Sequence, residues 1–526
     1  MSSRNVSGLK LILKTSVVSG MTLLSRILGL VRDIVFARFF GASLVMDAFL
    51  VANRIPNMLR RFFAEGAFSQ GFVPVMARYR ERHSHEDARE FVDAVAGTFG
   101  VVLFVFTLFG VVAAPLLVAV VAPGFIGDDG RFDLATLMLR FTFPYLFFVS
   151  LTAFAGGILN TYGKFGVPAF TPVILNVVLI AGAVWLSPLL EEPGMALAYA
   201  VLIAGIFQLA FQVPFLVRIR AMPRPKWALR HEGVRRAGRL MLPAIFGSSV
   251  AQINVLLGGI IASMLGVGKI SLLYYSDRLM EFPLGLFGIA LATVTLPHLS
   301  RLYSKESHEE FSATLDWSMK IAMLIAVPAA LGLILLSEPL VATIFYGGVF
   351  TANDVAMTAL ALEAFAVGLV GFSFVKVLAP AYFAREDTRT PVRIGLIALA
   401  VNFVLSVTLA WYLTRIGFAG THAGLALAIS VAALLNAWLL FVRLRRDGVL
   451  QLSPGWGVLL LQVAAASAAM SALLWWMRRP LSWWLESGVL DRSLALGIAI
   501  VLGAASYFVV LLLAGLRPSR LGLRRH

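Results

Sequence analysis

Arginine residues interrupt two stretches that otherwise have the composition of membrane-spanning helices. The stretches are SRILGLVRDIVFARFFG and MDAFLVANRIPNMLRRFFAEG, within residues 25–66. Their charged residues are Arg26, Arg32, Asp33, Arg38, Asp47, Arg54, Arg60, Arg61 and Glu65. One ionised side chain at the bilayer centre costs roughly 2.5–3.5 kcal/mol, so four deep ones cost on the order of 10–14 kcal/mol. Such a segment is tolerated only where its charges face protein, water or an anionic ligand.

The spacing of the second stretch places several charges on one helical face. Asp47, Arg54 and Arg61 follow an i, i+7, i+14 pattern, and Arg61 and Glu65 are an i,i+4 pair. Pro56 is expected to kink this helix. The charges of this stretch therefore form a stripe rather than a scatter.

In the first stretch, Arg26 and Asp33 share a face, and Arg32 is expected to point elsewhere. The alternative interpretation is that all these residues are snorkelling side chains at helix ends and structural ion pairs. That alternative suits Arg38 and Arg54, but it fails for Arg26 and Arg32, which lie in the middle of an apolar run.

The composition indicates an all-α polytopic membrane protein. Of 526 residues, 59% are hydrophobic and 14% are charged. The chain has no cysteine, which excludes disulfides, thiolate metal sites and thiol nucleophiles. No P-loop, Ser/His/Asp arrangement or histidine spacing typical of a metal site is present, so we expect neither an enzyme nor a metal or other cofactor.

Hydropathy predicts about fourteen transmembrane helices. Their approximate ranges are 15–40, 46–77, 91–122, 134–160, 169–187, 195–217, 239–265, 271–300, 315–336, 356–384, 393–413, 421–442, 457–477 and 493–516. Pro243, Pro328 and Pro380 are candidate kink points.

The distribution of basic residues predicts the orientation in the membrane. Alternate connections, counted with both termini, hold 28 Lys and Arg residues, whereas the other connections hold 6. The positive-inside rule therefore places both termini in the cytoplasm. Because topology accounts for most of the net charge of +16, nucleic acid is not expected as a partner. Trp475, Trp476, Trp483 and Trp484 bracket one outer boundary as an aromatic belt.

An internal repeat of about 224 residues divides the chain. Pro74 and Pro297 lie 223 residues apart, Arg54 and Arg278 lie 224 apart, and Asn176 lies 226 before its counterpart. The repeat predicts two pseudo-symmetric six-helix lobes, a plan common in transporters. We therefore expect a first lobe at 1–217, a basic linker at 218–238, a second lobe at 239–447 and two final helices within 448–526.

The repeat also predicts a binding site. If span eight mirrors span two, Arg278 in YYSDRLMEFP joins Arg26, Arg32 and Arg60 in a cationic cavity between the lobes. Guanidinium stays charged when desolvated and binds phosphate through two parallel hydrogen bonds, so an anionic substrate is expected. Asp33, Asp47 and Glu65 are expected to form state-dependent pairs that close one end of that cavity. The alternative for Arg278 is a local pair with Asp277 or Glu281.

Several motifs resemble those of the MurJ/MviN lipid II flippases of bacterial peptidoglycan synthesis. They include SRILGLVRD, MDAFLVANRIPNMLRRFFAEGAFSQGFVPV, ILNTYGKFGVPAFTPVILN, YYSDRLMEFPLGLFGIALATVTLPHLS and VKVLAP. The resemblance implies two lobes around a cationic cavity and a groove for the lipid tail at the last two helices. By motif, Arg26, Arg32, Asp47, Arg60 and Arg278 match functionally important charged positions, and Ser25, Asp33 and Glu65 match residues of the cavity or its gate.

The residues and the resemblance lead to one functional hypothesis. We expect the chain to move lipid II, an undecaprenyl-diphosphate-linked disaccharide pentapeptide, to the outer leaflet of the bacterial inner membrane by alternating access. The expected energy source is the membrane potential or an ion gradient, and membrane lipids are expected partners. Docking of cell-wall synthesis proteins is left open. The alternatives are a flippase for another polyprenyl-diphosphate-linked oligosaccharide and an ion-coupled drug exporter, whose cavity should be acidic.

Overall fold

The computed structural model describes residues 2–61, 68–82, 84–127, 130–285 and 289–516. The side chains of residues 2–15, 68–70, 82, 85, 242–251 and 289–294 lie outside this description. Within the described part, the regular structure is helical apart from one isolated bridge between Gly347 and Phe350. The prediction of an all-α fold is therefore confirmed.

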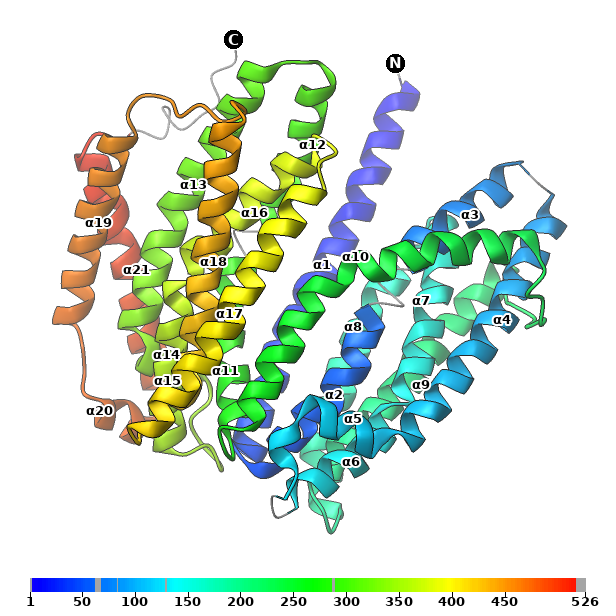
Figure 1. Cartoon of the computed structure of the whole chain (residues 1–526), viewed down its shortest axis with the longest axis horizontal. Helices are drawn as coiled ribbons and strands as arrows, with labels where there is room; N and C mark the ends of the chain where they lie inside the picture. The colour runs from blue at the N-terminus through cyan, green and yellow to red at the C-terminus, as the bar shows by residue number, and fades with distance from the viewer. Residues whose placement is uncertain (1, 62–67, 83, 128–129, 286–288, 517–526) are drawn as a thin grey trace. The chain divides into compact units, whose positions relative to one another are not determined.

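The chain forms two compact units, Met1–Gly268 and Lys269–His526 (Figure 1). The helices of the first unit are α1 (Ser2–Phe40), α2 (Leu44–Arg60), α3 (Phe68–Arg82), α4 (His85–Val112), α5 (Ala114–Val121), η2 (Pro123–Phe125), α6 (Arg131–Thr142), α7 (Tyr145–Thr161), α8 (Gly166–Ala181), η3 (Gly182–Leu186), η4 (Ser187–Leu189), α9 (Met195–Arg218) and α10 (Glu232–Ser263). Those of the second are α11 (Lys269–Pro283), α12 (Ile289–Ser304), α13 (His308–Leu335), α14 (Ser337–Ile344), α15 (Ala352–Val367), α16 (Leu369–Phe383), α17 (Arg389–Arg415), α18 (Thr421–Arg446), α19 (Trp456–Trp476), α20 (Leu481–Glu486) and α21 (Val489–Leu513).

Most of the described residues in the fourteen predicted spans are helical. Among the described residues, nine helices are long and apolar enough to cross a membrane, or ten if the bent pair α15–α16 is one span. The count of fourteen therefore stays a prediction. Predicted spans one, two, seven and eight do not meet this criterion of length and hydropathy. Spans two and eight include residues outside the description, and spans one and seven include residues whose side chains lie outside it.

The predicted kinks at prolines stay predictions. Helices α2, α13 and α16 continue through Pro56, Pro328 and Pro380. Pro243 lies within α10, where the side chains are outside the description. A 40° bend at Gly368 separates α15 from α16. A proline removes only one backbone donor, and neighbouring groups in a membrane protein can compensate for that loss.

The two units repeat the same set of helix pairings, which supports the predicted duplication. The pairs α2–α6, α3–α7, α7–α9 and α8–α9 of the first unit correspond in order to α11–α15, α12–α16, α16–α18 and α17–α18 of the second. The helix breaks correspond as well. Ala113 separates α4 from α5, and Leu336, 223 residues later, separates α13 from α14.

Helix α10 departs from this correspondence. Its counterpart α1 packs along α8, whereas α10 packs against α3, α4, α5 and η2 and belongs to the first unit. The compact units thus divide after Gly268, about 30 residues beyond the start predicted for the second lobe. The predicted ends of the first lobe at residue 217 and of the second lobe at residue 447 were derived from the sequence repeat. They stay predictions.

The basic linker before α10 lies along α4 in an extended conformation. The Arg224 N–H donates to Asp93 Oδ1 (2.6 Å) and the Lys226 N–H to the Asp93 carbonyl (2.9 Å). The Ala228 N–H donates to Thr98 Oγ1 (3.2 Å). These bonds fix the linker backbone on the first unit, and its basic side chains stay exposed.

Glycine allows two helices of the second unit to approach closely. A Cβ on Gly371 would lie 2.6 Å from the Leu434 nitrogen and 2.7 Å from the Ala433 carbonyl carbon, both in α18. Because those are backbone atoms, they cannot rotate away. Small residues commonly permit such contact between membrane helices.

We expect Gly371→Ala to lower the thermal stability of the protein in detergent, because the new methyl group must separate α16 from α18. The expected cost is about 1–3 kcal/mol, the usual range for overpacking. Gly395→Ala is the matched control, since a Cβ there meets no atom within 4 Å. Equal melting temperatures for the two variants would contradict this account of the packing.

Candidate functional site

The first unit contains a buried arginine held in one orientation by two helices. Arg32 of α1 donates to Asp33 Oδ1 from Nε (3.0 Å) and Nη2 (2.8 Å) and to Asn176 Oδ1 of α8 from Nη1 (3.0 Å). Asn176 Nδ2 in turn donates to the Ser25 carbonyl (3.0 Å), and the Arg32 guanidinium lies 5.6 Å from the centre of the Phe36 ring. These five residues are called the Arg32 cluster below.

The Arg32 cluster is almost closed to solvent. The side chains of Arg32 and Asp33 are 12% and 2% exposed. At this burial the pair depends on its additional hydrogen bonds, because desolvation of both charges otherwise exceeds their mutual attraction. Asn176 supplies one such bond, so the guanidinium plane is fixed by side chains from both α1 and α8.

One sequence-based interpretation of this cluster is wrong. Arg32 was expected to point away from the face of Asp33, but the two neighbouring side chains pair directly. The helical angle describes only where each Cβ points, whereas the long arginine side chain curves back to the carboxylate. Arg26, the residue expected to share the face of Asp33, has an exposed side chain.

A second buried charge cluster lies at the start of α2. Asp47 is fully buried, and its Oδ2 accepts a hydrogen bond from the Gly268 N–H (2.6 Å) and lies 4.0 Å from Arg131 Nη1 of α6. Asp47 also interacts electrostatically with Arg54, two turns further along α2. A carboxylate in the first turn of a helix is favoured by the helix dipole. We call Asp47, Arg54, Arg131 and Gly268 the Asp47 cluster.

The Asp47 cluster holds more positive than negative charge. Arg131 is 3% exposed and lies over the Phe125 ring at 4.6 Å, and Arg54 Nη1 has no hydrogen-bond partner among the described residues. A Cβ on Gly259 of α10 would collide with the Arg54 guanidinium. Glycine at 259 is therefore what makes room for this arginine.

The remaining predicted residues of the first unit lie in different surroundings. Arg60, in the last turn of α2, is half-buried, and its Nε lies 3.4 Å from Asn57 Oδ1. Arg61 is exposed. Glu65, the expected partner of Arg61, lies outside the described residues. The structure thus joins Arg32, Asp33 and Ser25 in one cluster and places Asp47 in another.

In the second unit, Arg278 forms the local pair that the sequence left open as an alternative. Its Nη1 lies 3.0 Å from Glu281 Oε2, and its guanidinium lies 5.7 Å from the centre of the Tyr274 ring. Both side chains of the pair are partly exposed, at 35% and 52%. Exposed pairs contribute only about 0–1 kcal/mol, so the contact with Glu281 is weak.

Two of these residues were not singled out as site residues from the sequence. Arg131 was counted only as a loop residue, and Asn176 only as a marker of the repeat. Asn176 could have been identified as a site residue, because an asparagine occupies the same position in both repeats. Asn176 and its counterpart Asn402 are both buried. Gln208 of α9 forms a buried interhelical hydrogen bond, because its Nε2 donates to the Thr171 carbonyl of α8 (2.8 Å).

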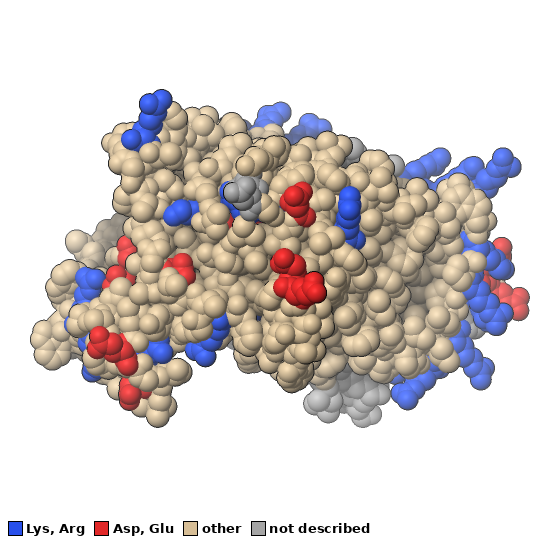
Figure 2. Space-filling view, turned by 90° about the horizontal axis from the view of Figure 1, so that it is seen from below, with Lys and Arg blue, Asp and Glu red and all other residues tan. Residues whose placement is uncertain are grey.

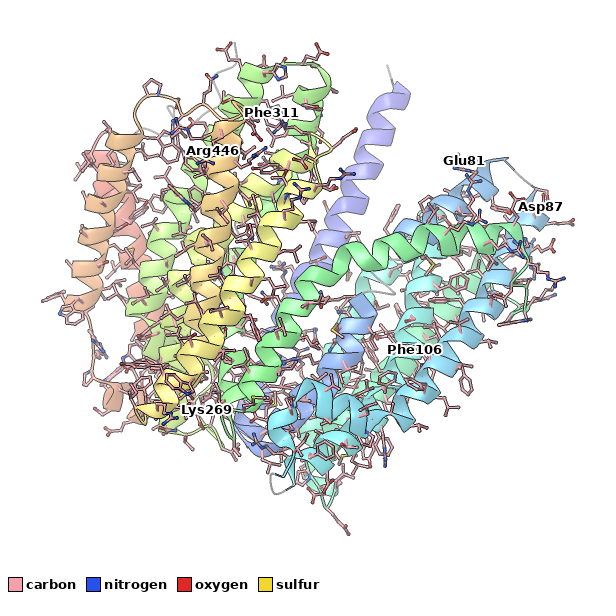
Figure 3. All side chains as sticks on the ribbon, viewed as in Figure 1. Glu81, Asp87, Phe106, Lys269, Phe311 and Arg446 are labelled. Atoms are coloured by element: carbon pink, nitrogen blue, oxygen red, sulfur yellow. The ribbon has the colours of Figure 1, made fainter. Side chains whose placement is uncertain are left out.

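Charged side chains elsewhere are sparse. Figure 2 shows a face on which uncharged residues predominate and basic and acidic side chains form small separate groups. In the second unit, Figure 3 shows Phe311 and Arg446 at one end and Lys269 at the other. Among the described residues, no group of three or more His, Asp or Glu side chains could hold a metal ion.

We expect Gly259→Ala to destabilise the protein by about 1–3 kcal/mol, because the new methyl group displaces the buried Arg54 guanidinium. Gly258→Ala is the adjacent control, since a Cβ there meets nothing within 4 Å. Thermal unfolding of Arg54→Ala/Gly259→Ala tests the contact itself. Its loss should be smaller than the sum of the two single losses, and strict additivity would show that the two residues do not interact.

The chain matches a known family over most of its length. Residues 36–493 match the family model described as "Lipid II flippase MurJ". A Vibrio cholerae protein named "Probable lipid II flippase MurJ" is 45% identical over 516 residues, covering 97% of each chain. A Burkholderia cenocepacia protein named "Lipid II flippase MurJ" is 43% identical over 505 residues, covering 95% of this chain and 96% of its own.

Solved structures agree with the sequence relatives. A structure titled "Lipid II flippase MurJ, inward closed conformation" aligns with a TM-score of 0.77 at 26% identity, covering 94% of this chain and 97% of that one. An inward-facing multidrug resistance transporter of the MATE family aligns with a TM-score of 0.64 at 16% identity, covering 82% and 98%. The second likeness concerns the fold alone.

Proposed function

The chain belongs to the lipid II flippase MurJ family, and from that premise we propose that a set of its arginines binds the diphosphate of lipid II during transfer across the membrane. The observation that carries the proposal is the Arg32 cluster. A guanidinium there is largely desolvated and fixed in plane by Asp33 and Asn176, within a span that the sequence predicts to cross the membrane. Ionisable residues retained inside a membrane are functional sites by default.

Guanidinium chemistry suits this substrate. Its N–H donors form a rigid fork that matches phosphate oxygens, and its charge persists in a low-dielectric environment. We propose Arg26, Arg32 and Arg60 of the first unit and Arg278 of the second as the contacts to the diphosphate and to nearby acidic groups. Asp33 and Asp47, together with Glu65, are proposed to change partners as the protein changes conformation.

The transfer is proposed to run from the cytoplasmic to the outer leaflet by alternating access. Each negative charge moved outward gains about 2.3 kcal/mol per 100 mV of an inside-negative membrane potential. A diphosphate is therefore driven in the required direction without ATP hydrolysis. An ion gradient is the other proposed energy source, and no enzymatic turnover is part of the proposal.

The proposed location is the bacterial cytoplasmic membrane, with both termini on the cytoplasmic side. The multi-pass character is supported by the long apolar helices, and the orientation by the bias of 28 against 6 basic residues. The undecaprenyl tail is proposed to stay in lipid beside α19 and α21. Lipid II is the proposed partner. Cell-wall synthesis proteins are not part of the proposal.

The rival functions are less well supported. A flippase for another polyprenyl-diphosphate-linked oligosaccharide would need the same arginines, but the family match favours lipid II. A cation exporter would need an acidic site, whereas Arg54, Arg131 and Asp47 leave the Asp47 cluster net positive. Identifying which lipid-linked precursor accumulates in the cytoplasmic leaflet when the protein is depleted distinguishes these functions.

We expect Arg278→Ala to reduce lipid II translocation in reconstituted vesicles about tenfold or more, the size expected for losing a charge-assisted hydrogen bond to a desolvated anion. Arg278→Lys keeps the positive charge but loses the paired N–H donors of the guanidinium, and it should retain part of the activity. Arg415→Ala, which removes an exposed arginine of the same unit, is the matched control and should leave the rate unchanged. Full activity of Arg278→Ala at normal protein levels would reject Arg278 as a contact.

A further inference from the structure

A cavity of about 240 Å³ lies in the second unit, at the end where α19 leads into α20. Residues of α14, α19, α20 and α21, the end of α13 and the connections between these helices line it. Leu474, Pro339 and Ile498 make up part of its apolar wall, and Arg478 and Arg479 provide positive charge. The cavity therefore combines the two surfaces that an amphiphile with an anionic head requires.

Trp484 contributes an unused hydrogen-bond donor to this cavity. The residue is 4% exposed and lines the cavity, and its Nε1 has no hydrogen-bond partner among the described residues. Tryptophan N–H groups usually find an acceptor when they are buried. A buried donor beside two arginines indicates that an acceptor from a bound molecule belongs here.

The two arginines are held at the cavity by aromatic rings. Arg478 lies 5.3 Å from the centre of the Trp475 ring, and Arg479 lies 3.9 Å from that of Trp483. Glu338 lies 3.5 Å from Arg478 and balances only one of the two charges. The aromatic contacts hold the guanidinium groups without neutralising them, so an excess of one positive charge remains for a ligand.

The surrounding tryptophans place the cavity at the depth of lipid headgroups. Trp475 and Trp476 are 63% and 82% exposed although they end an apolar helix. Exposed tryptophans at the end of a membrane helix mark the membrane–water interface, where phospholipid phosphates lie. Trp484 is an exception in the predicted aromatic belt, because its side chain is buried in the protein.

We propose that this cavity binds the phosphate group of an anionic bilayer lipid. The phosphate accepts hydrogen bonds from Arg478, Arg479 and the Trp484 N–H, and the acyl chain lies against Leu474 and Ile498. Basic pockets between membrane helices commonly hold anionic headgroups. The bound lipid is a component of the bilayer and not the transported substrate, and its site lies wholly within the second unit.

Native mass spectrometry of the purified full-length protein with added phosphatidylglycerol tests this site. Arg478→Gln/Arg479→Gln should weaken the tightest phosphatidylglycerol binding about tenfold or more. Trp484→Phe, which removes the N–H but keeps a ring, should weaken it about threefold. Glu338→Gln should strengthen it, because Arg478 loses its competing carboxylate. Arg445→Gln/Arg446→Gln removes two exposed arginines of α18 and should leave it unchanged.

Competition identifies the ligand chemistry. Phosphatidylglycerol should displace a labelled copy of itself, whereas inorganic phosphate and diacylglycerol at the same concentration should not. Equal displacement by inorganic phosphate would overturn the proposal of a lipid, and equal displacement by diacylglycerol would overturn recognition of the phosphate. Unchanged binding in both Trp484→Phe and the Arg478/Arg479 variant, with melting temperatures like the parent's, would reject the site.

Discussion

A guanidinium group removed from water is stable only where the protein around it compensates its charge. In the first unit, Asp33 and Asn176 do this for Arg32, and Asp47 is shared between Arg131 and Arg54. The cost of leaving such a charge uncompensated is several kcal/mol, comparable with the stability of a whole domain. The positions of Asn176 on α8 and of glycine at 259 on α10 both follow from this requirement.

The duplicated helix pattern gives these charges a common setting. The first two predicted spans of each repeat include α1 and α2 in the first unit and α11 in the second. These are the elements that carry Arg32, Asp47 and Arg278. The other spans of each repeat form an apolar framework with conserved pairings such as α7–α9 and α16–α18.

The sequence predicted the helices and the repeat because both depend on local composition and on spacing. It could not predict that Arg32 pairs with Asp33, because a helical angle ignores the reach of a long side chain. It also did not predict that α10 packs on the first unit, which depends on contacts with α3 and α4 rather than on the order of the chain. Trp484 was assigned to the aromatic belt, but its burial depends on how α20 packs against α14.

The central claim is that arginines, Arg32 foremost, recognise the diphosphate of the transported lipid. Its most direct test compares the affinity of the purified protein for lipid II with its affinity for an analogue whose diphosphate is replaced by a neutral linker. We expect the parent protein to prefer lipid II by about tenfold or more, and Arg32→Gln to remove most of that preference. Equal affinity of the parent protein for both lipids would contradict the account.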